Sequence, residues 1–198
     1  VRVVPQYNDV TVNSGVTWTA KAWDGSKGGI LAFLANGTVS VSGNIVGDGS
    51  VGPVGAPSTQ TSGGGYRGGQ SKSATGGNVG GQAWAGEATT GNQVQQNGAN
   101  NTGGGGATAG NQGNSQAGGG GGSHAAAGAA GGSRNGATGG QAATATVGNA
   151  TLTTAAFGGS GGGATDGGGR TGAGGSGGGF VFLSAPTITV TGKLSANG

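Results

Sequence analysis

The stretch Thr38-Val39-Ser40-Val41-Ser42-Gly43-Asn44-Ile45 decides the fold of this chain. Its apolar residues Val39, Val41 and Ile45 face one way, and Ser40 and Ser42 face the other. A period of two is typical of a strand with one buried face. The glycine between the two halves marks a turn. The stretch therefore predicts two short strands joined at a corner.

The same pattern returns 149 residues later as Thr187-Ile188-Thr189-Val190-Thr191-Gly192-Lys193-Leu194. At the same spacing, Leu31 to Leu34 matches Phe180 to Leu183, and Val10 to Val16 is a looser third copy. Repeats of about 20 residues that are rich in strands are typical of a β-solenoid, whose stacked strands bury Val, Ile and Leu. The alternative is that these segments are separate edges of a β-sandwich.

Most of the 56 glycines lie between the two copies. We therefore divide the chain into N-terminal strands (1–50), a proline-containing exit (51–60), a glycine-rich insertion (61–179) and a returning C-terminal unit (180–198). The fold class we expect is all-β or irregular, without a notable α-helix. In it, a small solenoid-like core is made by both chain ends, and a long insertion projects from that core.

The glycines of the insertion do not follow the strict period of three that collagen requires, and proline is absent from Ser58 to Ala185. Short runs such as Gly172, Gly175 and Gly178 do keep that spacing. They predict rods of polyglycine II, with three residues per turn, that bond laterally to several parallel and antiparallel neighbours. The competing interpretation continues the solenoid through the insertion, and the alternating residues Ala142 to Leu152 support it locally.

Composition excludes several classes of function. Charged residues make up 7% of the chain, and its 8 Lys and Arg form no cluster that would follow a phosphate backbone. No apolar run is long enough to span a membrane, and without cysteine there is no disulfide or thiolate metal site. His124 is the single histidine, and the five acids are far apart in sequence. We expect no enzyme activity, no cofactor and no metal.

Three aromatic residues of the insertion, Tyr66, Trp84 and Phe157, stand beside glycines or other small residues. They either cover the sides of the rods or stack on a sugar or a neighbouring subunit. Trp18 and Trp23 are expected to pack in the β-core. The Thr-x-Thr rows Thr17 to Thr19 and Thr187 to Thr191 resemble those of β-solenoid antifreeze proteins, which makes ice binding a less favoured alternative.

The stretch from Gly179 to Gly198 resembles segments of glycine-rich secreted bacterial proteins with parallel β-helical repeats. The insertion is similar in composition to the polyglycine-II sandwich of bacteriophage tail-fibre tip adhesins, although those have longer glycine blocks than Gly118 to Gly122. Both resemblances imply an extracellular, non-enzymatic protein held together by its backbone.

A stack of strands with uncovered first and last layers leaves unpaired edges that must be capped or paired. We therefore expect a structural subunit of an extracellular filament, surface appendage or matrix, whose partners are other copies of itself. The residues expected to mediate assembly are Val1, Arg2, Val3, Val4, Thr187, Ile188, Thr189 and Val190. The main alternative is a receptor-binding adhesin, of a bacteriophage tail tip or a cell surface, that recognises a glycan or protein. We expect no nucleic-acid partner and no membrane insertion.

Overall fold

The computed structural model describes residues 3–49, 64–73, 82–88, 94–108, 115–124, 126–145, 160–166 and 172–198. Within these ranges the chain is all-β: it forms strands and bridges and no helix. The all-β class expected from the sequence is confirmed. The exit segment 51–60 and most of Ala142 to Leu152 lie outside the described residues.

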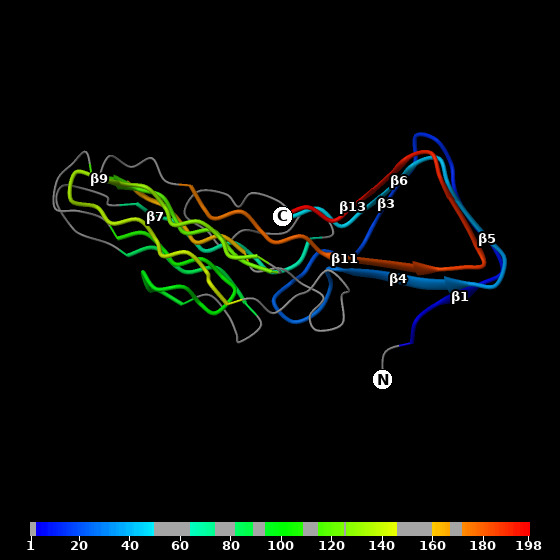
Figure 1. Cartoon of the computed structure of the whole chain (residues 1–198), viewed down its shortest axis with the longest axis horizontal. Helices are drawn as coiled ribbons and strands as arrows, with labels where there is room; N and C mark the ends of the chain where they lie inside the picture. The colour runs from blue at the N-terminus through cyan, green and yellow to red at the C-terminus, as the bar shows by residue number, and fades with distance from the viewer. Residues whose placement is uncertain are drawn as a thin grey trace.

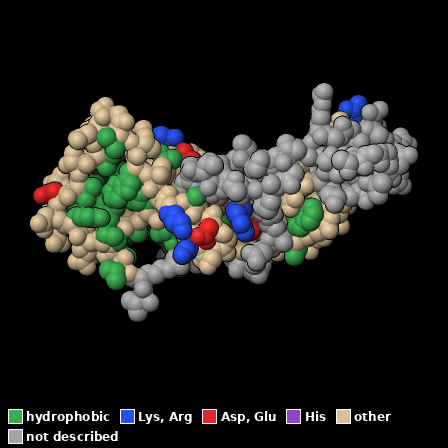
Figure 2. All heavy atoms as spheres, turned by 180° about the vertical axis from the view of Figure 1, so that it is seen from behind, with side chains coloured by type: hydrophobic (Ala, Val, Ile, Leu, Met, Phe, Trp, Pro, Cys, Tyr) green, Lys and Arg blue, Asp and Glu red, His purple; other side chains and the backbone are tan. Residues whose placement is uncertain are grey.

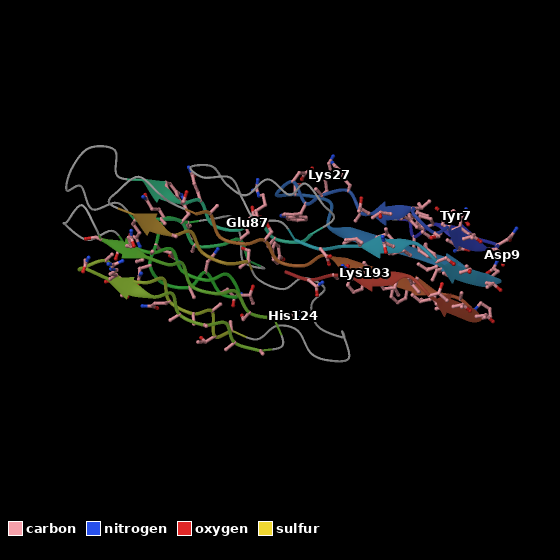
Figure 3. All side chains as sticks on the ribbon, turned by 90° about the horizontal axis from the view of Figure 1, so that it is seen from above. Tyr7, Asp9, Lys27, Glu87, His124 and Lys193 are labelled. Atoms are coloured by element: carbon pink, nitrogen blue, oxygen red, sulfur yellow. The ribbon has the colours of Figure 1, made fainter. Side chains whose placement is uncertain are left out.

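Nine strands form three parallel sheets of three strands each, with the orders β1-β4-β11, β2-β5-β12 and β3-β6-β13. Each sheet takes one strand from each of three layers, which we call together the strand stack. The first layer is β1 (Gln6–Tyr7), β2 (Val10–Val12) and β3 (Thr17–Thr19). The second is β4 (Ile30–Ala35), β5 (Thr38–Val41) and β6 (Asn44–Val46). The third is β11 (Phe180–Ser184), β12 (Thr187–Val190) and β13 (Lys193–Ser195). The sheets enclose a triangular outline in Figure 1, and the layers lie one above another in Figure 3.

The core of the stack lies inside this triangle and is centred on the second layer. Val39, Val41 and Ile45 are almost completely buried, as the alternation of the sequence predicts, and Phe33 is buried with them. The indole of Trp18 stacks on the Phe33 ring with the ring centroids 5.2 Å apart. The second layer is covered from both sides because it has a strand neighbour above and below in every sheet.

The sequence alignment of β4 with β11 is wrong by one residue. The structure pairs Phe180 with Ile30 and Leu183 with Phe33, whereas Thr187 pairs with Thr38 as expected. The corner before Thr187 is therefore one residue shorter than the corner before Thr38. Because side chains alternate along a strand, a one-residue shift exchanges the two faces of β11. The observed register places Val181 and Leu183 against the core.

The glycine-rich segment is inserted between the second and third layers. The chain leaves the stack after β6, where the N–H of Gly49 donates to the Asn197 carbonyl at 2.7 Å. It returns through Gly179, whose N–H donates to the Gly47 carbonyl at 2.7 Å. The described residues between 64 and 178, called here the glycine-rich part, extend sideways from the stack along the long axis of the molecule (Figure 1).

Successive N–H groups in the glycine-rich part point to different neighbours with a period of three. In the run 104–107 the first and last N–H groups both reach the run 160–163, and the two between them reach two other runs. The bonds are Gly104 to Ser160 at 2.9 Å, Gly105 to Gln141 at 2.9 Å, Gly106 to Gln96 at 2.8 Å and Ala107 to Gly163 at 3.0 Å. A β-strand would instead direct its N–H groups alternately to two sides.

The run 83–87 repeats this arrangement with antiparallel neighbours. Ala83 and Gly86 donate to the carbonyls of Ala107 and Gly104, while Trp84 and Glu87 donate to those of Gln70 and Arg67. Lateral bonding to several parallel and antiparallel runs is therefore observed. Only four two-residue strands interrupt it among the described residues: β7 (Lys72–Ser73), β8 (Gln116–Ala117), β9 (Ser133–Arg134) and β10 (Thr165–Asp166).

The runs lie so close together that most interior positions admit no side chain. A Cβ added at Gly162 would lie within 3.0 Å of the Gly104 and Gly105 carbonyls, and one at Gly140 would overlap the backbone of Gly105 and Gly120. A Cβ at Gly175 would meet nothing within 4 Å. Glycine is thus required by close backbone approach at the first two positions and not at the third.

We predict that Gly162→Ala lowers the free energy of unfolding by about 1–3 kcal/mol or more, because the runs must separate to admit the methyl group. Gly175→Ala is the matched control. It should leave the free energy of unfolding unchanged or raise it by about 0.4–1 kcal/mol, since alanine restricts the unfolded chain. Urea denaturation of both variants measures the difference. Equal stabilities would show that the close packing of the runs is not what holds this part together.

Candidate functional site

The third layer exposes core-facing side chains at one end of the stack. Ile188, Val190 and Leu194 are 42%, 40% and 41% exposed. Their ladder partners in the second layer are Val39, Val41 and Ile45, which are 0%, 1% and 0% exposed. The two sets occupy the same positions in their layers. The difference arises because no layer of the described chain lies beyond the third one.

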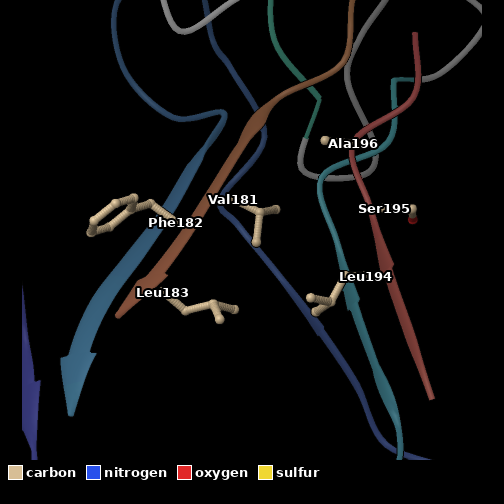
Figure 4. Close-up of a pocket in the computed structure, with 6 residues that line it drawn as sticks. All are labelled: Val181, Phe182, Leu183, Leu194, Ser195 and Ala196. Carbon is tan, nitrogen blue, oxygen red and sulfur yellow. The ribbon is translucent and has the colours of Figure 1, made fainter. Parts of the chain in front are cut away.

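A hollow opens between β11 and β13 at this end. It is lined by Val181, Phe182, Leu183 and the segment 194–196. In Figure 4 the side chains of Val181, Leu183 and Leu194 point into the space between the two strands, whereas Phe182 points away from it. The interior of the triangle is thus accessible from the third-layer end, and its lining is mainly aliphatic.

The outer face of β11 carries a feature that the sequence reasoning missed. The rings of Phe180 and Phe182 stack on the outside with their centroids 6.3 Å apart and their planes at 4°. The sequence alignment paired Phe182 with Phe33, whereas the structure pairs it with Ala32. The Phe-x-Phe spacing itself, which puts both rings on one face of a strand, was the signal that could have found the pair.

The first-layer end of the stack is also apolar. Val3 and Val4 are exposed there and line a second hollow together with Trp18 and the segment 30–32. Figure 2, which views the molecule from behind, shows hydrophobic side chains gathered over this end. β1 pairs with only Leu34 and Ala35 of β4, so the rest of β4 has no ladder partner on this side among the described residues.

The residues predicted to mediate assembly therefore lie at opposite ends of the stack. Val3 and Val4 are at the first-layer end, and the four residues of β12 are at the third-layer end. Within β12, Ile188 and Val190 face the interior, while Thr187 and Thr189 face outward like their partners Thr38 and Ser40. Val1 and Arg2 lie outside the described residues, as does Phe157.

The two described aromatic residues of the insertion are only partly exposed. Tyr66 packs edge-on against Trp23 with the ring centroids 5.8 Å apart and the planes at 89°. Trp84 is half-buried and forms a bridge with Gln95. The expectation that Trp23 belongs to the β-core is wrong, because its ring lies instead at the junction between the stack and the glycine-rich part.

A buried ion pair at this junction was not predicted. Glu87 is 2% exposed and accepts hydrogen bonds from the N–H and Nε of Arg67, each at 2.8 Å, and from Nη2 of the same residue. Trp23 Nε1, from the loop between β3 and β4, donates to Glu87 Oε2 at 3.1 Å. The carboxylate thus ties the strand stack to the glycine-rich part. Arg67 and Glu87 are 20 residues apart in sequence, and no motif joins them.

Burial and the negative charge of Glu87 both raise the pKa of the Tyr66 phenol. Both effects disfavour the phenolate, which would be a second negative charge in a partly desolvated place. The pKa of the Tyr66 phenol therefore responds to the charge on Glu87.

Asp48 joins the second layer to the end of the third. Its carboxylate accepts bonds from the Asn197 N–H at 2.8 Å, the Ser195 hydroxyl at 2.9 Å and Lys193 Nζ at 3.3 Å. Partial burial alone would raise the pKa of Asp48, but these three donors outweigh it and lower the pKa below its ordinary value of 3.8. Folding therefore favours the charged form.

In the described parts of the chain, no group of three or more His, Asp and Glu side chains is placed to hold a metal ion. The same residues include no helix that could cross a membrane.

No protein-family model matches the chain, no curated protein matches its sequence, and no solved structure matches its fold.

We predict that Asp48→Asn lowers the free energy of unfolding by about 1 kcal/mol at pH 7, because the donors then meet a neutral acceptor. The stabilisation from the charge is present above pH 3.8, the ordinary pKa, and is lost as the pH falls through the lower pKa of the folded protein. The stability difference between the two proteins should therefore shrink below pH 4. Urea denaturation at pH 7 and pH 3 measures it. Lys193→Met, which removes one donor, should cost less, and a difference that does not change with pH would contradict the assignment.

We predict that Glu87→Gln lowers the pKa of Tyr66 and destabilises the protein by about 2–4 kcal/mol, because Arg67 loses its buried counter-charge. Absorbance titration of the phenol in a Tyr7→Phe background isolates Tyr66, since the chain has 2 tyrosines. Lys21→Met breaks the exposed Lys21–Asp24 pair and should destabilise the protein less than Glu87→Gln does, because solvent screens that pair. An unchanged Tyr66 pKa in folded Glu87→Gln protein would show that the charge does not act on the phenol.

Proposed function

We propose that this protein is a structural subunit of an extracellular filament, surface appendage or matrix that associates through the ends of its strand stack. The observation that carries the proposal is the exposure of Ile188, Val190 and Leu194, whose partners one layer below are fully buried. A further layer on top would bury them in the same way.

Unpaired strand edges support the same conclusion. Within the described parts of the chain, β11, β12 and β13 each lie at the edge of their sheet, as do β1, β2 and β3 on the opposite side. The chain thus presents three parallel edges at each end, and such edges pair readily with other strands. We interpret the stack as a short β-solenoid, in which stacking of layers is the source of stability.

We further propose that the glycine-rich part is a bundle of polyglycine-II rods. The period of three in its N–H donors fits a helix with three residues per turn. At most of its interior glycines an added Cβ would overlap the backbone of a neighbouring run, as close lateral bonding between rods requires. Such a bundle would be a compact body with little side-chain chemistry, suited to spacing or presentation.

The absence of cysteine and methionine from a weakly charged chain supports an extracellular location, since neither oxidation-sensitive residue is present.

A receptor-binding adhesin is the second candidate. It is favoured by Trp84, which is half-buried on the glycine-rich part and forms a bridge with Gln95, the residue that follows the exposed Val94. An aromatic ring that stays partly exposed could contact a glycan or a protein. In this case the protein stays discrete, and Trp84→Ala reduces its binding to a cell surface.

We predict that Val190→Lys weakens self-association at least tenfold, because the contact would bury an unpaired charge. Thr38→Lys is the matched control: it carries the same charge on the outward face of β5, in the second layer and away from the proposed contact, and should assemble nearly normally. Sedimentation velocity over a range of concentrations and electron microscopy measure the assembly. Discrete monomers of the unmodified protein at all concentrations would overturn the proposal and favour the adhesin.

A further inference from the structure

We infer that the partner on the third-layer end is the first layer of a second copy, so that copies stack head to tail with their sheets in register. This inference rests on the proposed function and adds to it the identity and orientation of the contacting surfaces.

The two ends of the stack match in geometry. The ladders run Val10 to Val39 to Ile188 and Val12 to Val41 to Val190 in one sheet, and Trp18 to Ile45 to Leu194 in another. All these strands are parallel. A second copy translated along the stack would place its own Val10, Val12 and Trp18 over Ile188, Val190 and Leu194. These first-layer residues already cover Val39, Val41 and Ile45 in the same way within one chain.

The distribution of apolar surface favours this contact over a two-fold one. Val3, Val4 and Ile30 are exposed at the first-layer end, as Ile188, Val190 and Leu194 are at the other. A two-fold contact between two third-layer ends would leave both first-layer ends uncovered. A head-to-tail contact uses one end of each kind and covers both, and when it does not close it produces a filament.

Within the described chain, the short strand β1 leaves part of β4 unpaired at the first-layer end, and a neighbouring copy could cover that part. β1 covers only the last two residues of β4, and Val3 and Val4 line the hollow over the remainder. β11 has five residues, and in its own chain it spans Ile30 to Leu34 on the other side of β4. The β11 of a neighbouring copy is therefore long enough to close over both β1 and this hollow.

Engineered disulfides test the register directly, because the native chain has no cysteine. Thr11 and Thr189 both pair with Ser40 and face outward, so the next copy's Thr11 should lie beside Thr189. Neighbouring strands are about 4.8 Å apart, within the Cα separation of about 4.4–6.8 Å that a disulfide spans. A mixture of Thr11→Cys and Thr189→Cys proteins should form mixed covalent dimers under mild oxidation. The double variant should form a ladder of covalent oligomers.

Two controls fix the interpretation. Ser40→Cys combined with Thr189→Cys joins neighbouring strands of one chain and should close an intrachain disulfide, which validates the geometry. Ser26→Cys, on an exposed loop, should not cross-link to Thr189→Cys above the level of random collision.

The outcomes separate this inference from the proposed function. Mixed dimers and the ladder support head-to-tail stacking. Cross-linked dimers of Thr189→Cys alone, or an unmodified protein that assembles without forming the mixed disulfide, overturn the head-to-tail register and leave assembly standing. An unmodified protein that stays monomeric and forms no intermolecular cross-link overturns both.

Discussion

Close approach of backbones is the constraint on which the glycine-rich part depends. Its buried side chains are alanines, serines, a threonine and Glu87, and they remove too little apolar surface from water to offset the entropy of ordering so long a chain. What the interior offers instead is a dense set of N–H···O=C bonds between runs that are distant in sequence. Each such bond contributes about 0.5–1.5 kcal/mol net, and leaving one unmade in the interior costs more. Glycine is needed because a methyl group at Gly162 or Gly140 would hold neighbouring runs apart.

The strand stack is stabilised in a different way, by side-chain burial, and it meets the glycine-rich part at a junction. In the stack, a period of two sends alternate side chains into an apolar core, and Phe33 and Ile45 are buried. In the glycine-rich part, a period of three distributes bonds among several neighbours. At the junction, side-chain hydrogen bonds link the two parts. The Glu87 carboxylate accepts them from Arg67 and Trp23, and such charge-assisted bonds do not require a repeating sequence.

The sequence predicted the all-β class and the buried faces of β5 and β6, because alternation is a local signal. Parallel pairing was implied by the solenoid interpretation and by the resemblance to parallel β-helical repeats. The sequence did not predict the register of β11, since the corner before Thr187 is one residue shorter and an alignment at constant spacing ignores corner length. The Glu87–Arg67 ion pair could not be predicted either, because two isolated charged residues in a glycine-rich segment form no recognisable motif. The four expected assembly residues of β12 alternate in the structure. Ile188 and Val190 face the interior, and Thr187 and Thr189 face outward. The place of Val3 and Val4 at the opposite end follows only from the order of the layers.

The position of the insertion has a consequence for the third layer. Because the glycine-rich segment lies between the second and third layers, β11 to β13 close a long chain excursion when they dock, and loop closure over such a length opposes that docking. Among the described residues, the third layer is held on one side only, by its ladders to the second layer and by Asp48. Any body that covers Ile188, Val190 and Leu194 would therefore stabilise the closure as well as bury apolar surface. Assembly at this end and completion of the fold are thus expected to favour each other, since a partner that binds only the docked third layer shifts the folding equilibrium toward it.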